Sequence, residues 1–179
     1  MTRYFAFLRA INVGGHTVKM ETLRGLFVEL GFTRVETFIA SGNVIFESSE
    51  QDETTLITDI QTKLFTSLGY QVGTFIRTQQ ELAFIAAQKP FTTIALNSAA
   101  ALNIAFLSTA PSQSAIQQLM SLKTNIDDFH IHEREIYWLC QNKQSESTFS
   151  NAVLEKILGS QSTLRGIGTI KKLAEKYSA

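Results

Sequence analysis

Residues 33–48 read TRVETFIASGNVIFES, which is two strand-like runs separated by a polar joint. Residues 33–40 and 43–48 are rich in valine, isoleucine, threonine and phenylalanine, the residue types that suit a pleated, half-buried surface. Ser41 and Gly42 lie between the runs, and a short joint that contains a glycine is typical of a tight hairpin. The stretch therefore predicts two antiparallel strands with their turn at Ser41 and Gly42.

Apolar residues with helical spacing flank this hairpin on both sides. The upstream run follows the i, i+3, i+4, i+7 pattern of one helical face, and the downstream run continues in the same way. Gly31 ends the first run and Gly69 ends the second, and glycine readily adopts the left-handed conformation that terminates a helix. The helical residues are Leu23, Leu26, Phe27 and Leu30 upstream, and Leu56, Ile57, Ile60, Leu64, Phe65 and Leu68 downstream.

Strand-like runs at 3–9 (RYFAFLR) and 70–77 (YQVGTFIR) complete the order β-α-β-β-α-β in the first half of the chain. The second half repeats this order with different residues. Its elements are strands at 101–108, 128–133, 135–140 and 162–166, and helices at 112–122, 151–159 and 168–177. We therefore predict an α+β fold, a tandem duplication of ferredoxin-like β-α-β-β-α-β units with antiparallel sheets. The predicted divisions are a first repeat at 1–77, a helical connection at 78–100, and a second repeat with an extra C-terminal helix at 101–179.

Chain topology is expected to gather several polar residues at one end of the first sheet. Because a crossover between parallel strands is almost always right-handed, the four strands should lie in the order 4-1-3-2. The C-terminal end of strand one then lies beside the hairpin turn and the start of the first helix. The residues brought together are Arg9, Asn12, Gly14, Gly15, Ser41, Gly42 and Asn43.

These residues favour a binding site for a small, possibly anionic ligand. Gly14 and Gly15 allow backbone N–H groups to turn toward an anion, and the N-terminus of the first helix adds a positive partial charge. Arg9 offers a planar two-point clamp, Lys19 a point charge, and Arg165 a second guanidinium. The loop has neither the GxxxxGK[ST] nor the GxGxxG pattern of the common phosphate-binding loops.

Each of these features also has a purely structural interpretation. A glycine pair is often needed only for backbone geometry, and Ser41, Gly42 and Asn43 are sufficient as turn chemistry. An arginine at a strand end commonly pairs with a carboxylate, for which the candidates are Glu21, Glu36 and Glu47. A structural or interaction domain with no catalytic role therefore stays open, and the residues assign no catalytic group, cofactor or oligomeric state.

A nucleic-acid-binding module is the second functional hypothesis. Phe5, Phe7, Phe46 and Phe75 lie on predicted strands and would suit base stacking on an open sheet, as in RNA-binding β-α-β-β-α-β domains. However, 16 basic residues balance 16 acidic ones, so no net positive field favours a phosphate backbone. The strand-three stretch GNVIFES also fits the RNA-binding signature poorly. A nucleic-acid partner is therefore possible but not favoured, and packing of these rings against helices or the other repeat is preferred.

The remaining reactive side chains predict no metal site. His130 and His132 share one face of a predicted strand, as two metal ligands would, but no third ligand is identifiable. His16 lies in the glycine loop, where it suits either proton transfer or a simple surface role. Cys140, the single cysteine, is expected to be a small buried hydrophobe. No run approaches the length of a membrane span and the first residues do not resemble a signal peptide, so we expect no membrane association and a cytoplasmic location.

Several motifs along the chain are similar to those of a known bacterial family. They are LRAINVGG (8–15) followed by Met20, ETLRGLFVELGF (21–32), VETFIASGNVIF (35–46) and STLRGIGTIKKL (162–173). On these motifs, the whole chain resembles the family known as domain of unknown function 1697. The resemblance implies a tandem ferredoxin-like α+β fold and supplies no established activity.

The resemblance also marks individual positions. The family's N-terminal pattern falls on residues that are all present here: Arg9, Asn12, Gly14, Gly15, Met20, Ser41, Gly42 and Asn43. The C-terminal pattern runs Thr, any residue, Arg, Asn, Trp, Asn, Thr. Thr163, Arg165 and Thr169 match it, whereas residues 166–168 are Gly-Ile-Gly in place of Asn-Trp-Asn. Two side-chain amides and an indole are thus replaced, and a ligand at this stretch would have to be held by backbone groups.

Overall fold

The first sheet has four antiparallel strands, and their order confirms the predicted topology. The computed structural model describes residues 1–39 and 42–178. The strands are β1 (Thr2–Leu8), β2 (Thr33–Thr37), β3 (Asn43–Ser48) and β4 (Thr74–Thr78). They lie in the order β2-β3-β1-β4, which places β1 between β3 and β4. The C-terminal end of β1 therefore lies next to the start of β3, where Phe7 pairs with Asn43.

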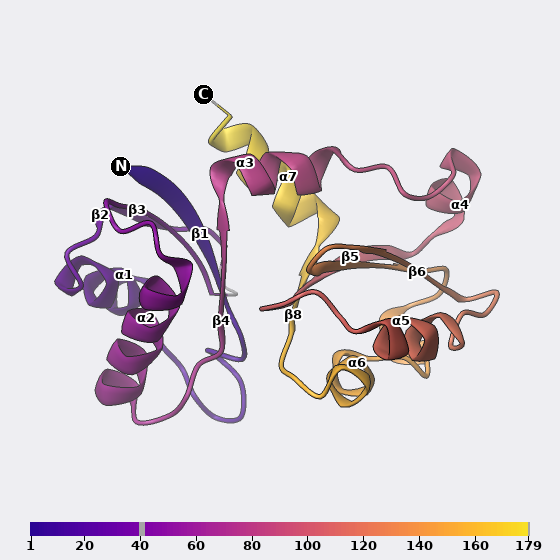
Figure 1. The fold of residues 1–179 in the computed structure, drawn as a ribbon, viewed down its shortest axis with the longest axis horizontal. Helices are drawn as coiled ribbons and strands as arrows, with labels where there is room; N and C mark the ends of the chain where they lie inside the picture. The colour runs from indigo at the N-terminus through magenta and orange to yellow at the C-terminus, as the bar shows by residue number, and fades with distance from the viewer. Residues whose placement is uncertain (40–41, 179) are drawn as a thin grey trace. The chain divides into compact units, whose positions relative to one another are not determined.

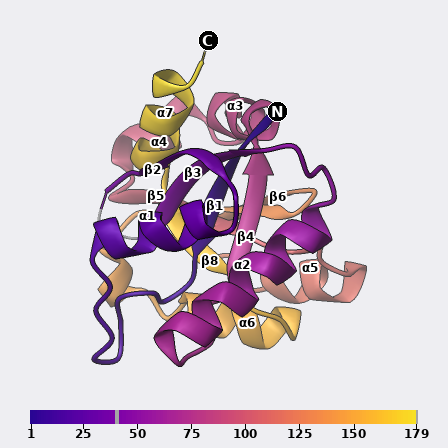
Figure 2. The same ribbon diagram turned by 90° about the vertical axis from the view of Figure 1, so that its left-hand side faces the viewer.

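Helices α1 (Met20–Glu29) and α2 (Glu53–Leu68) cover one face of this sheet (Figure 1, Figure 2). Alternate residues of β1, namely Tyr4, Ala6 and Leu8, belong to the hydrophobic core beneath the two helices. Phe27 of α1 packs against Phe46 of β3 with ring centroids 5.6 Å apart. Burial of each such large side chain contributes roughly 1.5–3 kcal/mol to stability, and this packing holds the helices on the sheet.

The ends of both helices follow the expected backbone chemistry. Gly31, just beyond α1, has a φ of 87°, and Gly69, which caps α2, has a φ of 83°. At the start of α2, the Asp52 carboxylate accepts a hydrogen bond from the backbone N of Thr55 at 2.8 Å. The glycine stops predicted for the two helices are therefore confirmed.

The second sheet repeats the first in both order and direction. Its strands are β5 (Ala101–Phe106), β6 (Asp127–His132), β7 (Glu135–Cys140) and β8 (Thr163–Gly166), in the order β6-β7-β5-β8. Helices α5 (Gln113–Met120) and α6 (Asn151–Leu158) contribute Leu119 and Leu154 to its core. A single 3₁₀ turn at Gln144–Glu146 precedes α6. The tandem ferredoxin-like architecture predicted from the sequence is thus confirmed.

Two features differ from the predicted pattern, namely the length of β2 and one additional helix. Strand β2 ends at Thr37, three residues before its predicted end at residue 40, and β3 begins at Asn43 as predicted. The predicted turn residue Ser41 lies outside the described residues. Helix α4 (Thr93–Ser98) was not predicted, whereas helix α3 (Gln79–Ala87) lies within the predicted helical connection and follows β4 directly. In the same way, α7 (Ile167–Lys176) follows β8 directly.

The chain forms two compact units. The first contains Met1–Ile85 together with Leu173–Ala179, and the second contains Ala86–Lys172. The first unit takes in most of α3, in which Leu82 and Ile85 are buried. It also takes the end of α7, since Tyr177 packs edge-on against Phe5 of β1 with ring centroids 5.5 Å apart. The final helix is thus divided between the two units.

Candidate functional site

The long loop between β1 and α1 closes on itself. The side-chain Oδ1 of Asn12 accepts a hydrogen bond from the backbone N of Val18 at 2.7 Å. The hydroxyl of Tyr70 donates to the backbone oxygen of Ile11 at 2.8 Å, and the rings of Tyr70 and His16 stack with centroids 3.7 Å apart. Asn12 and Tyr70 therefore hold a loop that has no helix or strand of its own.

The two glycines of this loop are required for backbone conformation. Gly14 and Gly15 have φ values of 65° and 83°, in the left-handed region that favours glycine. A Cβ atom built on either residue would meet no atom within 4 Å, so close approach of a neighbour is not the reason for glycine. Both residues are exposed, which leaves their backbone groups accessible from solvent.

Gly42 is the point where the hairpin meets the end of β1. Its backbone oxygen accepts a hydrogen bond from the backbone N of Leu8 at 2.9 Å. Its φ is 79°, and a Cβ atom there would lie 2.8 Å from Cγ2 of Ile11 and 3.1 Å from Cβ of Leu8. The neighbouring Asn43 is buried, and its Nδ2 donates to the backbone oxygen of Phe38 at 2.9 Å. The structure therefore brings the end of β1, the start of the loop and the Gly42–Asn43 corner together.

Cationic residues stand at the two ends of the loop. The backbone N of Arg9 donates to the backbone oxygen of Gly73 at 2.8 Å, which extends the pairing of β1 beyond Leu8, and its side chain is partly buried. Lys19 immediately precedes α1, and no side chain caps this helix. Lys19 is exposed, and its amino group has no hydrogen-bond or ion-pair partner within residues 1–39 and 42–178. The start of α1 therefore has no side-chain cap, and the acidic residue of its first turn is Glu21.

Two of the carboxylates considered as partners for Arg9 bind other groups. Oε1 of Glu47 lies 3.0 Å from Nη2 of Arg3. Oε2 of Glu36 accepts hydrogen bonds from Nζ of Lys176 at 2.9 Å and from the hydroxyl of Tyr177 at 2.8 Å. These two hydrogen bonds lower the pKa of Glu36 below its ordinary value. Glu36 and Glu47 thus tie β2 and β3 to other parts of the first unit.

Arg165 belongs to the second unit, whereas the residues above belong to the first. It is buried, and its Nη1 donates to Oγ1 of Thr163 and to the backbone oxygen of Leu164, both at 2.8 Å. Burial lowers the pKa of Arg165 to about 10, so the guanidinium stays charged at neutral pH. The hydrogen bonds of Arg165 thus join it to its own strand, β8.

The strand registers reveal a counterpart of Arg165 that the sequence did not point to. Phe5 lies opposite Arg77 on β4, and Ile104 lies opposite Arg165 on β8, so the two arginines occupy equivalent positions. Nη1 of Arg77 donates to the backbone oxygen of the preceding residue, Ile76, at 2.7 Å, as Arg165 does to Leu164. The repeated geometry indicates a shared structural role for this buried arginine.

Other predicted candidates are engaged in packing. Phe46 stacks on Phe32 at 4.4 Å between ring centroids and faces the core of the first unit, so it is not available to stack on a base. Cys140 is buried, as expected, and burial raises the pKa of its thiol. Within residues 1–39 and 42–178 no three His, Cys, Asp or Glu side chains are grouped to hold a metal ion. In the same residues, every helix is too short or too polar to cross a lipid bilayer.

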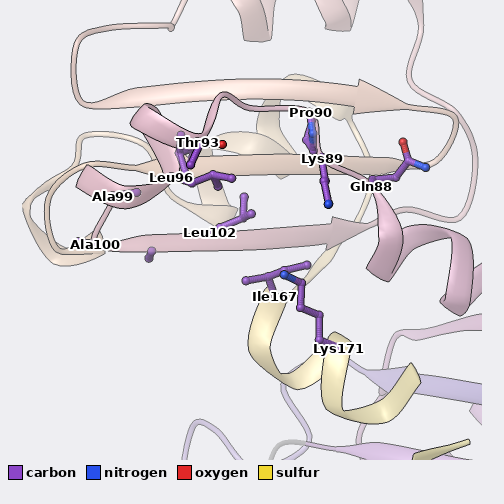
Figure 3. Close-up of a pocket in the computed structure, with 12 residues that line it drawn as sticks. Gln88, Lys89, Pro90, Thr93, Leu96, Ala99, Ala100, Leu102, Ile167 and Lys171 are labelled. Carbon is purple, nitrogen blue, oxygen red and sulfur yellow. The ribbon is translucent and has the colours of Figure 1, made fainter. Parts of the chain in front are cut away.

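A cavity of about 450 Å³ in the second unit was not foreseen (Figure 3). It lies between the segment after α3, the start of β5 and the first turns of α7, and Lys89 and Lys171 are its charged residues. Ile167 also lines it. The alanines at 99–101 are the one signal in the sequence that points here, because small side chains leave space beside a sheet.

Comparisons with known proteins agree with this architecture. A family model described as protein of unknown function (DUF1697) matches residues 1–137. The chain belongs to the DUF1697 family. The matched residues include the whole first unit up to Ile85, with Arg9, the glycine pair and Gly42, and they stop before residues 163–169.

A solved structure supports the fold of this DUF1697 member over its full length. It is the conserved bacterial protein SP0830 from Streptococcus pneumoniae, with a TM-score of 0.80 and 22% sequence identity, and the match covers 100% of this chain and 99% of that one. At this identity the likeness concerns the fold alone. A comparison with curated proteins found no match.

Proposed function

We propose that this DUF1697 protein is a binding domain for a small anionic ligand, held at the end of the first sheet. The proposal rests on the contact between the loop and the hairpin at Gly42, where Leu8 and Ile11 lie against the glycine. In this proposal the exposed glycine loop, the cationic residues Arg9 and Lys19 at its two ends and the uncapped start of α1 act together at this end of the sheet.

Each group has a role in this proposal. Arg9 and Lys19 supply positive charge, and Gly14 and Gly15 offer backbone N–H groups. Asn12 acts as a positioning residue because its Oδ1 holds the loop closed through Val18. The protein as a whole has no net charge, so attraction of an anion depends on this local arrangement rather than on a general field.

Titration of the full chain with inorganic phosphate and with succinate, followed by ¹⁵N-HSQC spectra, tests the proposal. We expect concentration-dependent shifts of the amide signals of Gly14, Gly15 and the first turn of α1. Arg9→Gln and Lys19→Gln should each weaken binding by about fivefold or more, since each removes one charge-assisted contact.

Arg24→Gln is the matched control, because Arg24 is an exposed cation one turn further along α1. Absence of shifts with both anions, or an equal loss of binding in Arg24→Gln, would reject the proposal in favour of a purely structural loop. If Arg9→Gln abolishes folding, Arg9 is structural, and the outcome then depends on Lys19→Gln.

A further inference from the structure

The cavity in the second unit has an apolar lining along one side. Leu102 of β5 and Leu139 of β7 come from the sheet, Leu96 from α4, and Ile167 from the first turn of α7. Its volume of about 450 Å³ lies within the range of roughly 300–1,000 Å³ found for small-molecule sites. Binding of an apolar group that displaces water from such a cavity lowers the free energy of the complex.

Two lysines give this cavity a positive charge. Figure 3 shows the side chains of Lys89 and Lys171 extending from opposite sides toward Leu102 and Ile167. Within the part of the chain that the structure describes, neither amino group has a hydrogen-bond or ion-pair partner. None of the residues that line the cavity is acidic. Helix α7 also begins at Ile167, so its positive end adds to the field of the two lysines.

This combination selects a particular chemistry. An apolar body would lie against the leucines and Ile167, and one anionic head would neutralise two lysines that otherwise face the same space as like charges. A cationic head would be repelled, and a nucleobase would find no aromatic ring among the lining residues to stack on. We propose that this cavity is a second binding site, separate from the one in the first unit, for a small amphiphilic anion such as a medium-chain carboxylate or an alkyl phosphate.

Isothermal titration calorimetry on the full chain tests the proposal with a set of matched probes. Octanoate and octyl phosphate carry both features of the ligand and share one tail, so their relative affinities show which head group is preferred. Octylammonium reverses the charge, octanol removes it, and acetate removes the tail. We expect binding of at least one of the two anionic probes, with octanol weaker by about tenfold and octylammonium and acetate not bound.

Variants assign the binding to this cavity. The double variant Lys89→Gln/Lys171→Gln should fold, because both side chains are exposed, and should weaken octanoate binding by about tenfold without affecting octanol. Lys172→Gln is the matched control on the same helix and should bind as the natural chain does. Ile167→Trp, which places an indole on the cavity wall, should reduce the binding of all tailed probes while both lysines remain.

Several results would overturn the proposal. These are no heat of binding with either anionic probe, equal affinity for octanoate, octanol and octylammonium, or the same loss of affinity in Lys172→Gln as in the double variant. A ¹⁵N-HSQC titration with octanoate separates this site from the loop of the first unit. Shifts at Leu102 and Ile167 support the proposal, and shifts confined to residues 9–22 overturn it without rejecting the function proposed for that loop.

Discussion

The two units have the same topology, but they connect their first strand to their first helix in different ways. In the second unit, residues 107–112 pass from β5 to α5, and the hydroxyl of Ser112 accepts a hydrogen bond from the backbone N of Ala115 at 3.1 Å. In the first unit, residues 9–19 make the same connection with a glycine pair, and no side chain caps α1. The fold therefore does not require the longer loop or the uncapped helix.

The longer connection and the uncapped helix of the first unit favour a function for this region. A short capped connection is enough to build the β-α crossover, as the second unit demonstrates. A longer loop orders more residues, which costs about 1–2 kcal/mol of backbone entropy for each. The extra residues in the first unit need an explanation other than topology, and ligand binding supplies one.

The largest loss of stability is expected on truncation of an aromatic side chain that both cores have at an equivalent position. Phe46 and Trp138 occupy equivalent positions, opposite Tyr4 in β1 and Asn103 in β5. Phe46→Ala and Trp138→Ala should each lower the free energy of unfolding by about 3–5 kcal/mol in urea titrations, because each leaves a cavity in a packed core.

Trp138→Ala should lower the free energy of unfolding more than Phe46→Ala does. Nε1 of Trp138 donates to Oδ1 of Asp127 at 2.8 Å, so truncation also removes a hydrogen bond from a buried carboxylate. Phe65→Ala is the control, since Phe65 is 51% exposed on α2, and it should cost less than about 1 kcal/mol. Losses of similar small size at all three positions would contradict the core described above.

Glycine substitutions should separate close approach from backbone conformation within the first unit. Gly42→Ala places a Cβ 2.8 Å from Ile11 at a φ of 79°, so we expect a loss of about 2–4 kcal/mol. Gly15→Ala has the same strain in φ but no neighbour within 4 Å, and should cost only about 1–2 kcal/mol. Thermal unfolding measures both, and a Gly42→Ala variant as stable as Gly15→Ala would show that the corner at Gly42 is loose.

Removing the cap of α5 and adding one to α1 tests whether the two units differ at the start of their first helix for a functional reason. Ser112→Ala should lower stability by about 1 kcal/mol, because it removes the cap of α5. Lys19→Ser should raise stability by about 0.5–1 kcal/mol, because Lys19 already has the extended conformation of a capping residue, with φ of −66° and ψ of 141°. If Lys19→Ser is more stable and also loses anion binding, the uncapped helix start is kept for function. Unchanged anion binding in this variant would argue against that conclusion.

The smallest effect is expected at Glu36 and depends on pH. Hydrogen bonds from Lys176 and Tyr177 lower the pKa of Glu36 in the folded protein below the ordinary value of 4.5. Its contribution is therefore fully present above that value and is lost as the pH falls through the lowered pKa. Because the pair is 46–47% exposed, Glu36→Gln should cost only about 0.5 kcal/mol at neutral pH and nothing at about pH 2. A difference that persists in acid would show that the effect comes from packing rather than charge.

Most of the fold was predictable because local signals agree with the final structure. Leu23, Leu26 and Phe27 have helical spacing and are buried beneath α1, and Gly31 ends that helix in the expected conformation. Handedness then fixed the strand order. Helix α4 was missed because its stability depends on remote contacts, such as the 3.1 Å hydrogen bond from Nε2 of Gln141 to the backbone oxygen of Ala95.

Less of the two candidate sites could be predicted from the sequence. Topology alone predicted that Arg9 and Gly42 meet at one end of a sheet, because strand order determines which ends are neighbours. Nothing local indicates that Lys89 and Lys171, which are far apart in the sequence, face one cavity, since side-chain direction depends on packing. Arg77 was overlooked for a similar reason, because its likeness to Arg165 appears only when the two sheet registers are aligned.

The division of α7 has a consequence for how the protein is made. Leu173 and Tyr177 belong to the first unit, whereas the earlier part of the helix belongs to the second. Translation at roughly 5–20 residues per second delivers residues 86–172 before these two emerge from the ribosome. The first unit is therefore synthesised first but is completed last, by residues 173–179. It must stay soluble without them while residues 86–172 are synthesised.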